Sequence, residues 1–269
     1  MRFLENLSFG QYIPSKSFVH KLDPRAKIGA LVLLLTGIFM ATRPYDWIIW
    51  VCLLCLCAHL AEIKISFLFR STRAVVILVL FTAVLNLFLA TGETVWKWGI
   101  LSITDTGIEL AWTMSLRLIL LVMYANLLTL TTSPMALSDG LESIFSPFKR
   151  FGFPAHELAM MMTIALRFIP TLLEETDRIL KAQLARGADL DRGSIIKRAK
   201  AFIPVLIPLF VIVFQRADDL AIAMEARCYR GGEGRTRMKP FSWNWYDSSV
   251  LAFCLVLVIG QKLFNYMVG

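Results

Sequence analysis

Residues 155–187 read AHELAMMMTIALRFIPTLLEETDRILKAQLARG, an apolar stretch that becomes charged without a loop-forming cluster between the two halves. This pattern predicts one long helix over residues 155–186. Pro170 is expected to kink the helix, because proline cannot donate a backbone hydrogen bond. Gly187 is expected to end it. Two ion pairs are predicted at a spacing of four residues, Glu174 with Arg178 and Asp177 with Lys181.

A second long helix is predicted from about Ser194 to Arg227, and it ends in the same way as the first. The first closes on Ala185-Arg186-Gly187 and the second on Ala226-Arg227-Cys228. Each follows a run with an acidic pair, Glu174-Glu175 or Asp218-Asp219. An arginine in a last turn suits the helix dipole, and small residues suit helix ends. The alternative is that each arginine projects into an acidic groove of a partner, because its planar fork forms paired bonds with carboxylates.

The rest of the chain is dominated by long apolar runs. Of its 269 residues 57% are hydrophobic, the mean hydropathy is +0.63, and only 18% are charged. A soluble domain has about 25% charged residues, so the apolar excess indicates lipid-facing surface. The fold class is therefore all-α, a polytopic membrane helix bundle with about five spans. Candidate spans are residues 28–42, 47–61, 74–92, 107–132 and 248–268.

The first two candidate spans are short and are expected to form a helical hairpin. Its loop is residues 43–46, and Trp47 and Trp50 are predicted to lie at the membrane interface. Lys27 and Arg43 are expected to extend their charged ends outward toward water.

Charge determines the expected orientation. Of the 28 Lys and Arg residues, 24 lie before residue 28, between 62 and 73, or between 133 and 247. Cytoplasmic loops concentrate such residues, so the N-terminus and residues 133–247 are predicted in the cytoplasm and the C-terminus outside. Three parts are expected: 1–132 with an N-terminal segment and four spans, 133–247 as a cytoplasmic domain, and 248–269 as the final span. The apolar stretch 201–214, about 21 Å of helix with two prolines, is then expected to lie along or dip into the cytoplasmic face.

Signals of catalysis, metal binding and cofactor binding are not found in the sequence. There is no phosphate-binding P-loop pattern, and His156-Glu157 lacks the second histidine of a zinc protease motif. Cys52, Cys55 and Cys57 lie inside an apolar run, where small buried side chains are a better interpretation than metal ligands. The basic segments lack the aromatic pattern of nucleic-acid binding. No catalytic residue, metal site, cofactor or nucleic-acid partner is predicted.

Three stretches together resemble one known family. They are GQYIP at 10–14 with HKLDPRAK at 20–27, the run from RFIP at 167–170 to ARG at 185–187, and the run from QRADDL at 215–220 to ARCYRG at 226–231. In this order they are similar to the signatures of the transmembrane (T) component of energy-coupling factor transporters, which are ATP-driven uptake systems of prokaryotes. The resemblance spans nearly the whole chain.

The resemblance implies a helical membrane bundle with two long cytoplasmic coupling helices. It implies that the two Ala-Arg-small signatures dock into two ABC ATPase subunits, a role that falls on residues 185–187 and 226–228. Cys228 departs from the expected Gly or Ser. The resemblance also implies a non-catalytic subunit in a prokaryotic cell membrane, which transmits ATP-driven motion to a membrane-embedded substrate-binding S component for vitamin or micronutrient uptake.

The apolar halves of the two helices are expected to face the S component, because methionine adapts to several partners. Packing against the chain's own spans is the equal alternative. The residues concerned are Met160, Met161, Met162, Leu166, Leu206 and Phe210.

Arg117 lies inside the fourth candidate span, and a charge within a membrane is a functional candidate. It could mark a solute path or pair with a polar neighbour such as Asn86, and the structural role is favoured. If it marks a path together with the proline-containing stretch 201–214, the chain would instead be a self-contained secondary transporter.

Overall fold

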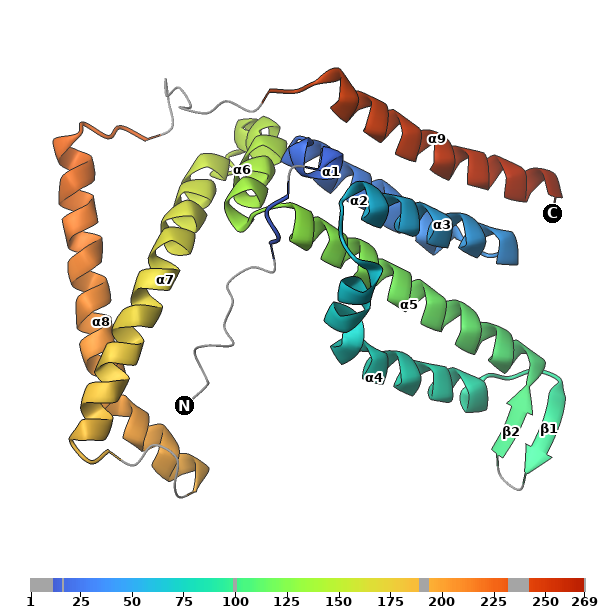
Figure 1. Ribbon diagram of the computed structural model, residues 1–269, viewed down its shortest axis with the longest axis horizontal. Coiled ribbons are helices and arrows are strands. Elements are labelled where there is room, and N and C mark those ends of the chain that lie inside the picture. The colour runs from blue at the N-terminus through green and yellow to red at the C-terminus, as the bar shows by residue number, and fades with distance from the viewer. Residues whose placement is uncertain (1–11, 16, 99–100, 189–193, 232–241, 269) are drawn as a thin grey trace. The chain divides into compact units, whose positions relative to one another are not determined.

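The computed structural model describes residues 12–15, 17–98, 101–188, 194–231 and 242–268. These residues are almost entirely helical, as the sequence predicts, and they fall into two compact units (Figure 1). One unit comprises the described residues between 10 and 140 and between 240 and 269, and the other those between 141 and 239. Each unit is described by itself below.

The first unit contains five long helices and a small hairpin. The helices are α2 (Pro24–Met40), α3 (Pro44–Leu60), α4 (Ile65–Leu89), α5 (Asp105–Thr131) and α9 (Trp245–Val268), preceded by the single turn α1 (Phe18–Lys21). Strands β1 (Thr94–Trp98) and β2 (Leu101–Thr104) pair antiparallel between α4 and α5, and neither strand was predicted. Helices α2 and α9 pack side by side, as do α4 and α5.

The core of this unit lies where α2, α3, α5 and α9 meet, and it contains both tryptophans of α3. Trp47 is 4% exposed and Trp50 is 1% exposed, so both rings pack in the protein core and not on the outer surface of the bundle. The physical reason is a glycine on the facing helix. A Cβ added to Gly37 would lie 2.2 Å from the ring of Trp50, so only glycine leaves room for the indole. The Tyr124 hydroxyl donates to the carbonyl of Trp50 at 2.9 Å and holds α3 against α5.

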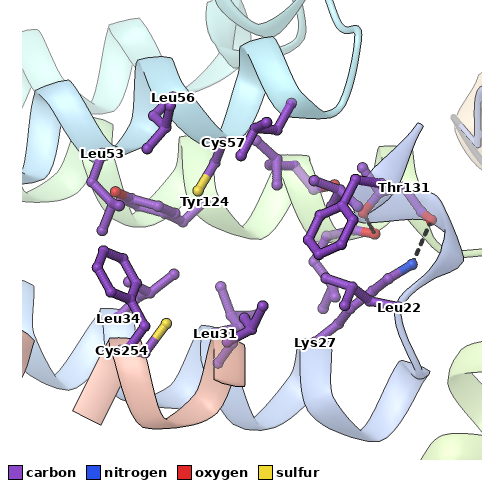
Figure 2. A pocket seen from close by; sticks show the side chains of 18 residues that line it. Leu22, Lys27, Leu31, Leu34, Leu53, Leu56, Cys57, Tyr124, Thr131 and Cys254 are labelled. Atoms are coloured by element: carbon purple, nitrogen blue, oxygen red, sulfur yellow. Dashed lines mark hydrogen bonds between the residues drawn. The ribbon is translucent and has the colours of Figure 1, made fainter. Parts of the chain in front are cut away.

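Lys27 is also buried, at 7% exposure, which overturns the expectation that it extends outward. Its Nζ donates to the carbonyl oxygen of Thr131 at 3.0 Å, to that of His20 at 3.3 Å and to the Thr132 hydroxyl at 3.3 Å. Figure 2 shows this ammonium at one end of an apolar cavity of about 160 Å³, with the bond to Thr131 dashed. These three acceptors compensate the free-energy cost of burying the ammonium group. The Lys27 side chain therefore binds polar groups of the protein and does not extend to water. Arg43, in contrast, is exposed.

Among the described residues, four helices are long and apolar enough to cross a membrane: Asp105–Thr131, Ala155–Ala185, Lys200–Ala226 and Trp245–Met267. Pro44–Leu60 and Val75–Leu89 are shorter apolar helices. Two of the four were predicted as spans and the other two as cytoplasmic helices. The apolar stretch 201–214 reaches this length because the helix continues through Pro204 and Pro208 without a break. Length and composition alone therefore do not separate the helices predicted as spans from those predicted as cytoplasmic in this chain.

The second unit is built on two long helices that follow the end of α6 (Pro134–Phe145) and the 3₁₀ turn η1 (Ser146–Phe151). They are α7 (Ala155–Ala185) and α8 (Ile195–Ala226), and both predicted helices are confirmed to within one residue at each end. Figure 1 shows α8 (orange) crossing α7 (yellow) near the C-terminal end of α7. The two helices run antiparallel, so their C-termini lie at opposite ends of the pair.

Candidate functional site

The first candidate end is the C-terminus of α7, where Arg186 is the C-cap residue. Gly187 has φ +86°, and its N–H donates to the carbonyl of Leu184 at 2.9 Å. The next N–H, of Ala188, donates to the carbonyl of Gln183 at 3.0 Å. These two bonds form a Schellman motif, in which a left-handed residue reverses the chain and satisfies the last carbonyls. Glycine adopts this conformation at little cost, so the predicted stop at Gly187 is confirmed.

The second candidate end, at α8, repeats this backbone arrangement. Arg227 is the C-cap residue, and the N–H of Cys228 donates to the carbonyl of Glu225 at 2.8 Å. The N–H of Tyr229 donates to the carbonyl of Met224 at 3.1 Å. Cys228 has φ +55°, although it carries a side chain, and the left-handed conformation costs such a residue about 1–2 kcal/mol. The third position of each Ala-Arg-small signature is thus the left-handed residue of a helix cap.

Both arginines project from these caps into the open. Arg186 and Arg227 are exposed, as are the flanking Ala185, Gly187, Ala226 and Cys228. Within the described part of the chain, neither guanidinium has an ion-pair partner. Each arginine is the C-cap residue of its helix, where the helix dipole favours positive charge. The arrangement presents two guanidinium groups that are free to bind carboxylates of another protein.

Direct bonds tie the two helices together near their crossing. Gln183 Nε2 donates to the carbonyl oxygen of Pro204 at 3.2 Å. That oxygen has no partner within its own helix, because the residue four positions later is Pro208, which has no N–H. The sequence analysis did not identify Gln183, although two prolines four residues apart signal a free carbonyl.

An ion pair joins the helices further along. Arg216 Nη2 lies 3.3 Å from Glu175 Oε1, and Arg178 Nη1 lies 3.6 Å from Glu175 Oε2. The predicted partner of Arg178 was Glu174, and this is wrong, because Glu175 faces α8 and collects both cations whereas Glu174 is exposed. The predicted pair of Asp177 with Lys181 is confirmed. The side chain of Lys181 is 73% exposed and that of Asp177 is 38% exposed, so this pair lies on the surface of α7.

The two arginines are far apart on this crossed pair. Gln183 lies beside Pro204, and Arg227 follows 23 positions later along α8, which is about 35 Å of helix. Arg186 lies only three residues beyond Gln183. The structure therefore places the two signatures at opposite ends of the pair and does not bring them into one site.

A cleft of about 570 Å³ opens beside Arg227, between the end of α8 and the start of α7. Met160 and Ile164 of α7 form one wall. The other lining residues come from the end of α8 and the chain after it: Leu220, Met224, Arg227, Cys228, Tyr229, Arg230 and Gly231. Apolar side chains thus lie next to two arginines, and the sequence analysis missed Tyr229 and Arg230 as members of this site.

The residues predicted to face the S component fall into two groups. Met161 and Met162 are 54% and 53% exposed, near the end of α7 that borders the cleft. Leu206 and Phe210, 45% and 60% exposed, lie close to the crossing at Pro204, about 30 Å of helix away. Met160 and Leu166 are half-buried. Met160 lines the cleft with Arg227, so one predicted partner surface adjoins the other.

Arg117, in the first unit, lies against the end of α2. Its Nη2 donates to the carbonyl of Ala41 at 3.1 Å, and its guanidinium lies 5.8 Å from the ring centroids of Phe39 and Trp47. Asn86 is not its partner, because the bonds of Arg117 go to Ala41 and Met114, and the Asn86 amide donates to the carbonyl of Thr82 in its own helix. Arg117 thus stabilises a helix end, which is the structural role that the sequence favoured.

Comparison with known proteins identifies the family. The family model described as "Cobalt transport protein", CbiQ, matches residues 15–238. The chain belongs to the CbiQ family. The transmembrane protein EcfT of the energy-coupling factor transporter from Thermanaerovibrio acidaminovorans is 51% identical over 269 residues, all of both chains. The protein of that name from Acidaminococcus fermentans is 50% identical over 95% of this chain and 96% of its own. That from Streptococcus thermophilus is 41% identical over 97% and 98%.

These relatives confirm the resemblance to the T components of energy-coupling factor transporters. Together with the apolar helices they place this CbiQ member in a membrane as a transport protein. In the described residues no group of three or more His, Cys, Asp and Glu side chains could hold a metal ion.

Proposed function

We propose that the chain is the coupling subunit of an ATP-driven importer of vitamins or other micronutrients. Two ABC ATPase subunits bind Arg186 and Arg227 and hydrolyse ATP, and α7 and α8 carry their motion to a membrane-embedded S component. The observation that carries this proposal is the repeated Schellman end. The same cap presents an exposed arginine at each of two distant helix ends, as two separate docking partners would require.

The docking chemistry follows from the caps. An exposed guanidinium at a helix C-terminus can form paired bonds with an aspartate or glutamate of a groove. The left-handed residue that follows each arginine reverses the direction of the chain, so the helix ends at the arginine. At Gly187 an added Cβ would meet no atom within 4 Å, which leaves space for the wall of a groove.

Transmission of motion requires that the two helices move together. The bonds Gln183–Pro204 and Glu175–Arg216 link α7 to α8 at two levels. Helix α7 has 31 residues, about 46 Å, and the helix continues through Pro170, so a displacement at one end is carried along its length. The exposed apolar side chains of both helices are the surface proposed to contact the S component. The chain itself holds no ATP, and its part in the cycle is mechanical.

The test replaces both arginines, with a matched control on the same helix. Arg186→Ala with Arg227→Ala is expected to abolish ATP-driven uptake by the reconstituted complex, while the chain still inserts and binds its S component. Lys181→Ala is the control, because Lys181 carries the same charge, lies outside the Glu175–Arg216 link, and has a side chain that is 73% exposed on α7. Normal uptake by the double variant, or an equal loss in the control, would refute the proposal.

The proposed orientation places α7 and α8 in the cytoplasm and the C-terminus outside. Cys228 is exposed at the end of α8 and can report this directly. In a variant that retains only this cysteine, an impermeant thiol reagent should label inverted vesicles and leave intact cells unlabelled. Labelling of intact cells would reverse the orientation.

A further inference from the structure

Four phenylalanines crowd the connection between α6 and α7 in the aromatic–basic turn, defined here as residues 145–153. Phe151 is 87% exposed and Phe148 is 52% exposed. Neighbouring rings contact one another along the turn. The ring centroid of Phe145 lies 5.4 Å from that of Phe153 and 6.3 Å from that of Phe148, and the Phe148 and Phe151 centroids are 6.4 Å apart. A cluster of this size on an open surface indicates a contact with something apolar.

The turn is held in one shape and is not a loose loop. Its core is the 3₁₀ helix η1, with a proline near its start and Gly152 at φ +81° as its left-handed cap. The N–H of Gly152 donates to the carbonyl of Lys149 at 3.0 Å. A side-chain bond of 2.9 Å between His156 Nδ1 and Glu142 Oε1 joins the flanking helices just outside the turn. The rings are therefore presented together, with little ordering entropy left to lose on binding.

Two cations lie among the rings. Lys149 and Arg150 are consecutive, exposed, and placed between Phe148 and Phe151. Phenylalanine inserts into the boundary between headgroups and acyl chains, while Lys and Arg side chains bind anionic headgroups above it. We propose that the aromatic–basic turn inserts into an anionic membrane surface and anchors the start of α7 there.

The path of the chain favours lipid as the occupant. Helix α5, a candidate span, ends at Thr131, and α6 begins only three residues later at Pro134. With 12 residues, α6 adds about 18 Å before the turn begins. The turn thus begins only 14 residues after the end of a span, and this short connection lets it reach the membrane surface. A protein partner that buried these rings would leave the adjacent cations to find carboxylates, whereas a lipid surface satisfies both kinds of side chain at once.

The experiment measures how deep the turn lies in a bilayer. The full chain is reconstituted with its five cysteines replaced, and a nitroxide is attached at Phe151→Cys. Collisions are compared for oxygen, which concentrates among acyl chains, and for an aqueous nickel complex. In vesicles of phosphatidylcholine with phosphatidylglycerol, the ratio of oxygen to nickel collisions should be far higher than at Asp219→Cys, an exposed control site on α8. Phe148→Cys should behave like Phe151→Cys, which guards against an effect of one substitution on folding.

A second experiment tests the contribution of the two cations. Lys149→Gln and Arg150→Gln should each lower the inserted fraction about fivefold in the anionic vesicles and change little in pure phosphatidylcholine. Water access at Phe151→Cys equal to that at Asp219→Cys would overturn the proposal. A label that neither reagent reaches would also overturn it, because it would show that the turn packs against protein. Insertion that ignores both phosphatidylglycerol and the two cations would refute the anionic surface.

Discussion

The two signature ends share one backbone and differ in their surroundings. At the end of α7 the left-handed residue is Gly187, which is unstrained, and the surface around it is open. At the end of α8 it is Cys228, which is strained, and the arginine beside it borders a cleft with an apolar wall from α7. The shared part is what placing an arginine at a helix end requires. The strain of the left-handed residue and the cleft beside the arginine differ between the ends. Two non-identical partners, or two partners with unequal roles, would be distinguished by these differences.

Reversal of one charge at a time has the largest expected effect and tests whether the ends are equivalent. Arg186→Glu and Arg227→Glu should each weaken the binding of an isolated ATPase subunit by about 2–5 kcal/mol, because a carboxylate would face the acidic groove. Titration of detergent-solubilised chain with each ATPase, without nucleotide, measures the loss. If the ends serve different partners, each variant loses affinity for one ATPase and keeps it for the other. Loss of both affinities from a single reversal would mean that the ends form one site.

An exchange of the two left-handed residues has a smaller effect and isolates the strain. Cys228→Gly should stabilise the end of α8 by about 1 kcal/mol, and Gly187→Cys should destabilise the end of α7 by the same amount. Hydrogen exchange at the N–H groups of Tyr229 and Ala188, which close the two caps, reports each change as about a fivefold shift in protection. Shifts of the same sign at both ends would contradict the assignment of strain to Cys228.

The extent of the two long helices could be predicted from sequence because their ends carry local signals. The apolar-to-charged pattern and Gly187 can both be recognised from residues that are adjacent in the sequence. Both helices match their predicted bounds closely. The αL conformation of Cys228 carries no such signal, because cysteine rarely adopts it. What surrounds each end depends on partners distant in sequence, such as Met160 beside Arg227, which no local pattern reports.

The same limit explains what the sequence analysis missed in the first unit. Trp50 was predicted at the interface from its type, whereas its burial depends on Gly37 of another helix. Lys27 was expected to reach water, whereas its acceptors at Thr131 and Thr132 lie more than a hundred residues away in sequence. Composition predicts that a helix is apolar enough for a membrane, but only the packing decides which of its faces is buried against protein.

The smallest expected effect concerns the link between the ends, and two neighbouring carboxylates provide a matched pair. Glu175→Gln should destabilise the packing of α7 on α8 by about 0.5–1 kcal/mol, because it weakens a half-buried pair with Arg216. Glu174→Gln changes the same charge one residue away on an exposed position and should have no measurable effect. A double-mutant cycle with Arg216→Gln, read as the free energy of unfolding of the full chain in detergent, isolates the pair. If the ends communicate through this link, Glu175→Gln also reduces uptake per ATP hydrolysed without changing either ATPase affinity, which neither arginine variant can do. An unchanged ratio of uptake to hydrolysis would place the communication at the Gln183–Pro204 contact instead.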